Sequence, residues 1–320
     1  MDNSKPLVTF AVFAYNQERL ITDAVNSALA QTYSPLEVII SDDCSTDGTF
    51  ALIEQIVDNY AGPHKVLVHR NEYNLGYVGN VNRVWELSSG DLVVFQGGDD
   101  ISLPHRTSKL VETWLSHDPH PDLLYSGTVR INEDGDVIRV DNAVIEKTPP
   151  IDDTITGRKI FIAGGCANAM SRSLHFNVGS LDESVMAEDF VYSFRALLGN
   201  GVVGIPEPLV YYRQHSASIL GELRAERKLL GRLRDEKYLK ARLSTLNEYK
   251  RAMDTYNVKR PLLRWLLNRR IKSAEMNLQF SSSSIVKRSL LMLWAFITLR
   301  FRLLLDMLSA LSQHSAKTTH

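Results

Sequence analysis

Four short apolar runs divide residues 7–100, and each of them ends in polar residues. The runs begin at Leu7, Leu36, Val66 and Leu92, and the stretches between them carry apolar side chains at helical spacing. A near-continuous apolar run is typical of a strand that is buried on both faces. Strands that alternate with helices build a parallel sheet with helices on both faces. The sequence therefore predicts an α/β fold around a mostly parallel, Rossmann-like sheet.

Acidic and amide side chains follow three of these strands, at the point where each strand ends. Asn16 follows the first strand, Asp42-Asp43 the second and Asp99-Asp100 the fourth. The carboxyl ends of parallel strands lie at one edge of a sheet, where ligands bind in open α/β folds. Adjacent carboxylates repel one another unless a cation offsets their charge. A solvated acidic turn would explain one such cluster, but three at one edge favour a ligand site.

The region after residue 100 adds shorter elements to this plan. Helical spacing predicts a helix over residues 104–115, and Asp134-Gly135 is typical of a hairpin turn. Residues 141–158 are polar and are expected to form a loop, and two short strands are expected between residues 202 and 212. A further helix opens at Glu188-Asp189, where the two acids either cap the helix or take part in chemistry.

Charge divides the chain near residue 216. Residues 1–216 contain 15 basic and 29 acidic side chains and carry a net charge of −14, whereas residues 217–320 contain 21 basic and 8 acidic side chains and carry +13. A basic, helical C-terminal region of this kind favours contact with an anionic surface. No nucleic-acid-binding motif accompanies the charge, so membrane headgroups are the expected partner.

The last apolar stretch, Ile285 to Leu311, is interrupted by charged side chains. Its longest uncharged run, Ser289 to Leu299, has 11 residues, whereas a membrane-spanning helix needs about 20. The pattern predicts a helix that lies in the membrane interface. A helix packed on the catalytic domain, or on a second subunit in a homo-oligomer, is the alternative.

Several protein classes are excluded by the residues that the chain lacks. The first strand is not followed by Gly-x-Gly-x-x-Gly, and no Gly-Lys-Ser/Thr occurs, which excludes the usual dinucleotide and P-loop sites. Two cysteines, Cys44 and Cys166, are too few for a disulfide framework, and we expect them to be small buried side chains. No signal peptide is evident at the N-terminus, so a cytoplasmic location is expected.

Six motifs occur in an order that resembles family 2 glycosyltransferases with a glycosyltransferase A fold. The resemblance extends over about residues 7–218 and is specific at the level of the family, although each motif alone is a weak signal. The motifs are Phe13-Ala14-Tyr15-Asn16, Ser41-Asp42-Asp43-Cys44-Ser45-Thr46-Asp47-Gly48-Thr49, Asn74-Leu75-Gly76, Gly98-Asp99-Asp100, Glu188-Asp189 and Tyr212-Arg213-Gln214-His215.

The resemblance implies a role for each matching residue. Asp189 would be the catalytic base, and a divalent cation, Mn²⁺ or Mg²⁺, would be bound through Asp99 with help from Asp100 or His215. The residues implied in binding the nucleotide and diphosphate are Tyr15, Asp43, Arg70, Asn74, Gly76, Gly98 and Arg213. Many family members have Asp where this chain has Gly97, so an altered metal requirement is expected.

The resemblance also implies an activity. We expect a catalytic domain over residues 1–218 that moves a sugar from a nucleoside-diphosphate donor, most simply a UDP-sugar, to an acceptor hydroxyl with inversion. Residues 219–320 would form a basic helical region that attaches the protein peripherally to the inner face of the cell membrane. A glycan or lipid-linked acceptor is expected, as in surface-polysaccharide synthesis. A non-catalytic subunit that binds the sugar nucleotide is the alternative.

Overall fold

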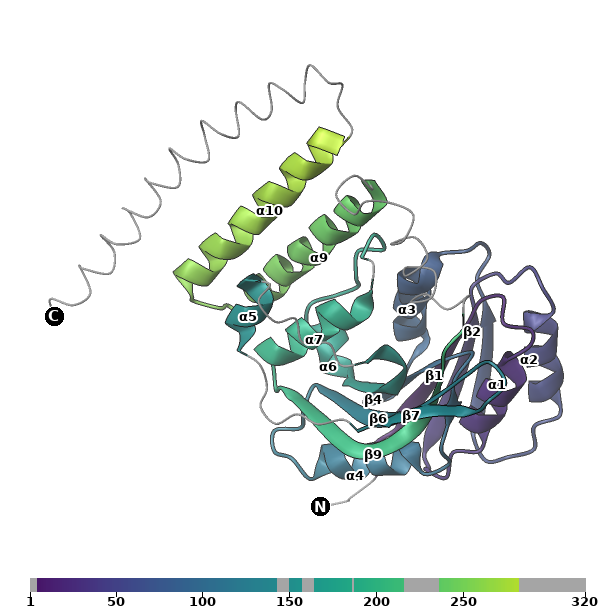
Figure 1. Ribbon diagram of the computed structural model, residues 1–320. Helices are drawn as coiled ribbons and strands as arrows, with labels where there is room; N and C mark the ends of the chain where they lie inside the picture. Colours follow the sequence, from purple (N-terminus) through teal and green to yellow (C-terminus); the bar gives the residue numbers. More distant parts are fainter. Residues whose placement is uncertain (1–4, 143–149, 157–163, 186, 216–235, 282–320) are drawn as a thin grey trace, which may run out of the picture.

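The computed structural model describes residues 5–142, 150–156, 164–185, 187–215 and 236–281 (Figure 1). It contains one sheet of nine strands in the order β3-β2-β1-β4-β8-β6-β9-β5, with β7 paired to β6. The strands are β1 (Val8–Ala14), β2 (Leu36–Asp42), β3 (Lys65–Arg70), β4 (Leu92–Gly97), β5 (Ile101–Ser102), β6 (Leu123–Ile131), β7 (Val137–Asp141), β8 (Asn168–Ser171) and β9 (Val202–Arg213). The helices are α1 (Ile21–Leu29), α2 (Thr49–Asp58), α3 (Gly76–Leu87), α4 (Arg106–Leu115), α5 (Ile151–Thr156), the short 3-10 helix η1 (Gly165–Ala167), α6 (Arg172–Phe176), α7 (Glu188–Leu198), α9 (Glu236–Thr255) and α10 (Pro261–Ser281).

The sheet is mixed around a parallel core. Strands β1, β2, β3 and β4 are parallel, which confirms the predicted βα units. Strand β8 runs antiparallel between β4 and β6, and β5 runs antiparallel to β9. The two strands expected between residues 202 and 212 are one continuous strand, because β9 pairs with β6 along both halves and its register shifts opposite Gly127.

Two cores cover the two faces of the sheet, and successive residues of each buried strand alternate between them. In β1, Phe10 and Val12 belong to the core beneath α1, α2 and α4, whereas Ala11 and Phe13 belong to the core beneath α3, α6 and α7. Such alternation follows from the two-residue period of a strand. Because both faces are covered, the carboxyl edge of the parallel strands is left to carry polar residues.

A third core joins the C-terminal helices to the rest of the chain. It contains Phe194 of α7, Tyr249 of α9 and Leu267 of α10, and Figure 1 shows α9 and α10 side by side next to α7. Ile155 of α5 is fully buried in the same core. The prediction of a loop over residues 141–158 is therefore wrong for residues 151–156, because the apolar side of this short helix packs against α7 and α10.

The predicted interfacial stretch from Ile285 to Leu311 lies outside the described residues. Within the described part of the chain, no helix is long and apolar enough to cross a membrane.

Candidate functional site

The ends of the four parallel strands lie next to one another. The N–H of Asp43 donates to the carbonyl of Ala14 at 2.8 Å, and the N–H of Gly98 donates to the carbonyl of Phe13, also at 2.8 Å. The N–H of Asn71 donates to Asp42 O at 2.9 Å. Ladder bonds thus continue past the strand ends and bring the predicted polar clusters to one edge of the sheet.

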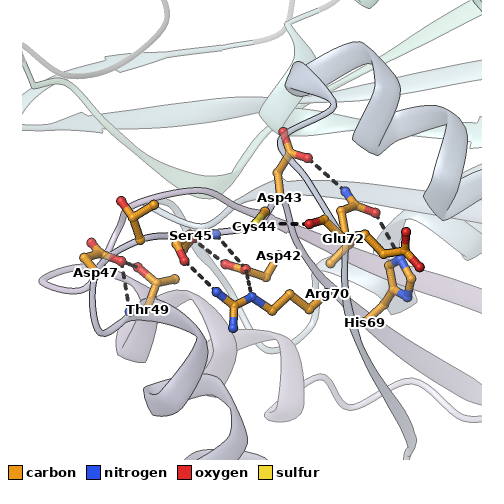
Figure 2. A network of polar contacts seen from close by, with 12 residues as sticks. Asp42, Asp43, Cys44, Ser45, Asp47, Thr49, His69, Arg70 and Glu72 are labelled. Atoms are coloured by element: carbon orange, nitrogen blue, oxygen red, sulfur yellow. Dashed lines mark hydrogen bonds and ion pairs between the residues drawn. The ribbon is translucent and has the colours of Figure 1, made fainter.

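The loops after β1 and β2 are locked together by side chains. Asn16, at a left-handed φ of 51°, accepts a hydrogen bond from the N–H of Thr46 at 2.8 Å, and its own N–H donates to Ser45 Oγ at 2.9 Å. Figure 2 shows Arg70 beneath this loop, where it contacts Asp42 Oδ2 at 3.5 Å and donates to Ser45 O at 2.8 Å. The Arg70 guanidinium thus holds the shape of the loop.

Asp43 is 3% exposed and connects β2 to the segment before α3. Its Oδ1 accepts hydrogen bonds from the N–H of Leu75 at 2.8 Å and from Asn71 Nδ2 at 2.9 Å. Asn74 Oδ1 accepts the N–H of Gly76 at 2.8 Å, and Gly76 has a φ of +76° that favours glycine. Asp43, Asn74 and Gly76 are therefore brought together.

Tyr15 lies at the end of β1 with 44% of its surface exposed, so its ring is accessible to a ligand. At the neighbouring strand end, Gly98 lies tightly against the same loop. A Cβ at position 98 would lie 2.2 Å from Gln17 Oε1 and 3.0 Å from Phe13 O. Glycine is favoured here because a larger residue would displace the Gln17 side chain and press on the Phe13 carbonyl.

Asp99 and His215 meet although 116 positions separate them in sequence: His215 Nε2 lies 2.8 Å from Asp99 Oδ2. This hydrogen bond raises the pKa of His215. Arg213 supports the arrangement from the end of β9. Its N–H donates to Asp100 Oδ1 at 2.9 Å, and its guanidinium donates to Asp99 O at 3.1 Å and Glu133 O at 2.7 Å. The Arg213 side chain is therefore engaged with backbone carbonyls.

Asp100 is 1% exposed, and burial and the neighbouring Asp99 raise its pKa well above the ordinary value. Both carboxylates lie against Gly97, where a Cβ would be 2.6 Å from Asp99 Oδ1 and 3.1 Å from Asp100 Oδ2. Among the described residues, no group of three or more His, Cys, Asp or Glu side chains could hold a metal ion. The donor set of Asp99 and His215 fits a cation that takes its remaining ligands from phosphate and water.

Asp189 lies at the N-terminus of α7 beside Glu188, which is 3% exposed. Asp189 Oδ2 accepts the N–H of Gly165 at 3.1 Å, whereas the buried Oδ1 has no donor within the described ranges. Tyr77 Oη donates to Glu188 Oε1 at 3.1 Å. Burial and the neighbouring Glu188 raise the pKa of Asp189 well above the ordinary value. This is an acid that can hold and release a proton at higher pH than a free aspartate.

Two further residues connect the Asp99-Asp100 turn with Asp189. Arg106 is fully buried and donates to the carbonyls of Phe95 at 2.9 Å and Cys166 at 3.0 Å. The Cys166 thiol hydrogen-bonds Asp100, and burial holds its pKa well above the ordinary value. The sequence carries a signal for Arg106, which occupies an apolar stripe position four residues before Leu110. It carries none for the placement of Cys166.

A family model described as Glycosyl transferase family 2 matches residues 9–177. One curated relative is the Escherichia coli UDP-Glc:alpha-D-GlcNAc-diphosphoundecaprenol beta-1,3-glucosyltransferase WfaP, which is 36% identical over 94 residues, covering 29% of this chain and 36% of the relative. The chain spans 47%, 66% and 34% of the length of three other curated relatives.

Two solved structures share the fold. TarS residues 1–349 from S. aureus, in complex with UDP-GlcNAc, has a TM-score of 0.54 at 18% identity and covers 85% of this chain and 90% of its own. The mannosyltransferase PcManGT from Pyrobaculum calidifontis, in complex with GDP-Man and Mn²⁺, has a TM-score of 0.55 at 17% identity and covers 98% of this chain and 87% of its own. The predicted glycosyltransferase A fold with C-terminal helices is confirmed.

Proposed function

Because this chain belongs to glycosyl transferase family 2, we propose that it transfers a sugar from a nucleoside-diphosphate donor to an acceptor hydroxyl with inversion. The observation that carries the proposal is the geometry of the sheet edge. Asp43 follows β2, Asp99 and His215 follow β4 and β9, and Asp189 opens α7. These residues lie around the carboxyl ends of β1, β2 and β4. Ligands bind at this edge in open α/β sheets.

UDP is the proposed nucleotide. Two similar proteins support it, since one is named for UDP-Glc and the other was solved with UDP-GlcNAc. In this chain, Asp43 would accept a hydrogen bond from the base, and the exposed ring of Tyr15 would stack on it. Asn74 and Gly76 would line the ribose, while Gly98 lets the backbone approach the diphosphate. Arg70 and Arg213 remain in the proposed site as residues that hold the loops on its nucleotide and diphosphate sides.

The proposed cation is Mn²⁺ or Mg²⁺, held by Asp99 and His215 and adjoined by Asp100. The Mn²⁺ in the PcManGT complex supports this choice, as does the preference of both ions for carboxylate oxygen. When bound, the ion supplies Lewis-acid stabilisation of the negative charge on the leaving diphosphate. Because Gly97 contributes no ligand, we expect weak binding of the ion in the absence of the donor.

Asp189 is the proposed base. Its Oδ1 is buried without a donor within the described ranges, and the Gly165 N–H holds its other oxygen. An acceptor hydroxyl placed against Oδ1 would lose its proton to the carboxylate as the new C–O bond forms. General-base catalysis of this kind contributes roughly 10²–10⁴-fold.

The proposed acceptor is a glycan or a lipid-linked sugar in surface-polysaccharide synthesis. The diphosphoundecaprenol acceptor in the name of WfaP supports it, and the +13 charge of residues 217–320 supports peripheral attachment to an anionic membrane. Association of two chains through the C-terminal helices is the alternative use of that region.

Release of UDP from UDP-glucose and UDP-N-acetylglucosamine in the presence of Mn²⁺ tests the proposal. We expect Asp189→Ala to lower turnover about 100-fold or more and to leave UDP binding intact, whereas Asp99→Ala should raise the Mn²⁺ concentration that half-saturates activity. Wild-type turnover by Asp189→Ala would refute the base assignment. UDP binding without any turnover by the unaltered chain would instead support a non-catalytic subunit, which no present observation favours.

A further inference from the structure

Helix α3 contacts both sides of the proposed active site. At its N-terminus, the N–H of Leu75 donates to Asp43 Oδ1 at 2.8 Å, on the nucleotide side. Tyr77 lies two residues later, and its hydroxyl donates to Glu188 Oε1 at 3.1 Å, next to the proposed base. One short stretch of helix therefore connects the donor-binding segment with Asp189.

The Tyr77 ring has a defined orientation. It packs edge-on against Phe13 at the end of β1, with 5.6 Å between ring centroids and 66° between ring planes. Because the ring is held by this contact, the direction of the hydroxyl is held as well. Glu188, its acceptor, is 3% exposed. A phenol that donates to a buried carboxylate contributes to the placement of that carboxylate more than an exposed contact would.

The chain that leads into α7 is attached to the same helix. Asn82 Nδ2 donates to the carbonyl of Leu181, and the N–H of Leu181 donates back to Asn82 Oδ1, both at 2.9 Å. Three valines of α3 lie in the core that also contains Leu181 and Val185. The position of α7 relative to α3 is therefore set by packing and by this reciprocal pair. The Tyr77 hydroxyl adds a contact at the carboxylates themselves.

We propose that Tyr77 is a positioning residue: its hydroxyl holds Glu188, and thereby keeps the adjacent Asp189 carboxylate aimed at the acceptor. This inference rests on the proposed function, because it gives Tyr77 a role in that reaction. Tyr77 does not touch the reacting atoms and acts through Glu188. Since α3 begins at the donor-binding segment, the same contact makes the placement of the base depend on the order of that segment.

The titratable groups around Asp189 come from three elements. Glu188 lies on α7, the same helix as Asp189, and interacts there with Tyr192. Tyr77 lies on α3 and Cys166 on η1. Burial holds the pKa values of Tyr77 and Cys166 well above their ordinary values, so both stay neutral. The two carboxylates are then the groups that titrate, and they titrate as a pair.

The Tyr77→Phe variant removes the hydroxyl and keeps the ring. We expect its kcat for UDP release from UDP-glucose or UDP-N-acetylglucosamine to fall about tenfold, the scale of one hydrogen bond to a charged group. Its Kd for UDP, measured by calorimetry, should stay within about twofold. The acid limb of the kcat/KM profile should move to higher pH, because the lost hydrogen bond stabilised the charged form of the pair.

Two companion variants make the pH result specific. Glu188→Gln keeps an acceptor oxygen for Tyr77 but removes the charge that raises the pKa of Asp189, so the acid limb should move to lower pH. Tyr33→Phe is the matched control. The Tyr33 hydroxyl donates to Pro6 O at 2.7 Å, and the buried side chain packs in the core on the other face of the sheet. We expect Tyr33→Phe to leave both kcat and the acid limb unchanged.

The outcomes distinguish a failure of the role given to Tyr77 from a failure of the proposed function. An active wild type together with a folded Tyr77→Phe variant that keeps wild-type kcat and acid limb overturns the role of Tyr77 and leaves the proposed function standing. An equal loss in Tyr77→Phe and Tyr33→Phe also overturns it, since the effect would then be one of stability. A wild type that releases no UDP overturns the proposed function, and the role of Tyr77 falls with it.

Discussion

Asp189, the proposed base, carries a cost to stability. Burial and the adjacent Glu188 raise its pKa well above the ordinary value. The folded chain therefore holds a proton at pH values where the unfolded chain has lost it. Stability contributed by such a group falls as the pH rises from the unfolded pKa, about 3.9, through the raised pKa of the folded state. A residue retained for chemistry alone is expected to carry this penalty.

The Asp189→Asn variant separates the two effects. We expect it to melt about 1–2 °C above the wild type near pH 7, the shift that ~1 kcal/mol gives in a protein of this size, because an amide has no charge to bury. The gain should shrink as the pH is lowered toward 3.9 and vanish below about pH 3, where the carboxyl is protonated in both states. Melting temperatures measured across this pH range, beside an assay of UDP release, provide the check. A variant that is less stable than the wild type at neutral pH would contradict the argument.

At the scale of elements, a buried ion pair attaches α9 to α7. Arg195 Nη2 lies 2.8 Å from Glu248 Oε2, and the two side chains are 0% and 5% exposed. Arg195 also donates to the carbonyl of Gly179, and Glu248 accepts the N–H of Asp182. These bonds pair the two buried charges with each other and with the backbone, although Arg195 Nε has no hydrogen-bond partner within the described residues. Breaking such a pair leaves a cation buried without its partner.

Glu248→Gln tests this attachment. We expect the free energy of unfolding to fall by about 3 kcal/mol, as is usual when one partner of a buried pair is removed. Urea denaturation measures the change. Glu236→Gln on the same helix is the matched control, because Glu236 is 53% exposed in its pair with Lys240 and should cost less than about 0.5 kcal/mol. Similar losses in the two variants would contradict the importance of burial.

At the scale of the whole molecule, the C-terminal helices are joined to the sheet-containing part of the chain by a common core. Phe194 of α7 stacks on Tyr249 of α9 with 4.1 Å between ring centroids. Both C-terminal helices, α9 and α10, contribute to that core. The expected boundary at residue 218 therefore separates two regions by charge, while residues 236–281 pack against α7. Attachment to a membrane is then a proposal about residues 285–320.

Deletion of residues 285–320 tests the membrane proposal and leaves this core in place. We expect the protein to move from the membrane fraction to the soluble fraction, because the deletion removes the apolar stretch together with its flanking basic residues. Fractionation of cells, with sedimentation of anionic vesicles as a second measurement, shows the change. UDP release should stay within about twofold of the full chain if only attachment is lost. An unchanged distribution would refute the proposal.

The parallel core of the sheet and the polar character of its carboxyl edge can be predicted from the sequence alone. The runs from Leu7, Leu36, Val66 and Leu92 are local signals, since an apolar strand that is buried on both faces is recognisable without its neighbours. The acids at positions 43, 99 and 189 were found in the same way, because each follows or opens a recognisable element. Family motifs then joined them into one predicted site.

The partners of those residues follow from the folded arrangement of the chain. Tyr77 and Glu188 are 111 positions apart in sequence, and no local pattern pairs them. The guanidinium of Arg213 is engaged by backbone carbonyls from other parts of the chain. Burial of α5 likewise depends on α7 and α10. The polar sequence around it therefore predicted a loop where the structure has a short helix. Contacts of this kind depend on distances between elements, which periodicity and composition do not encode.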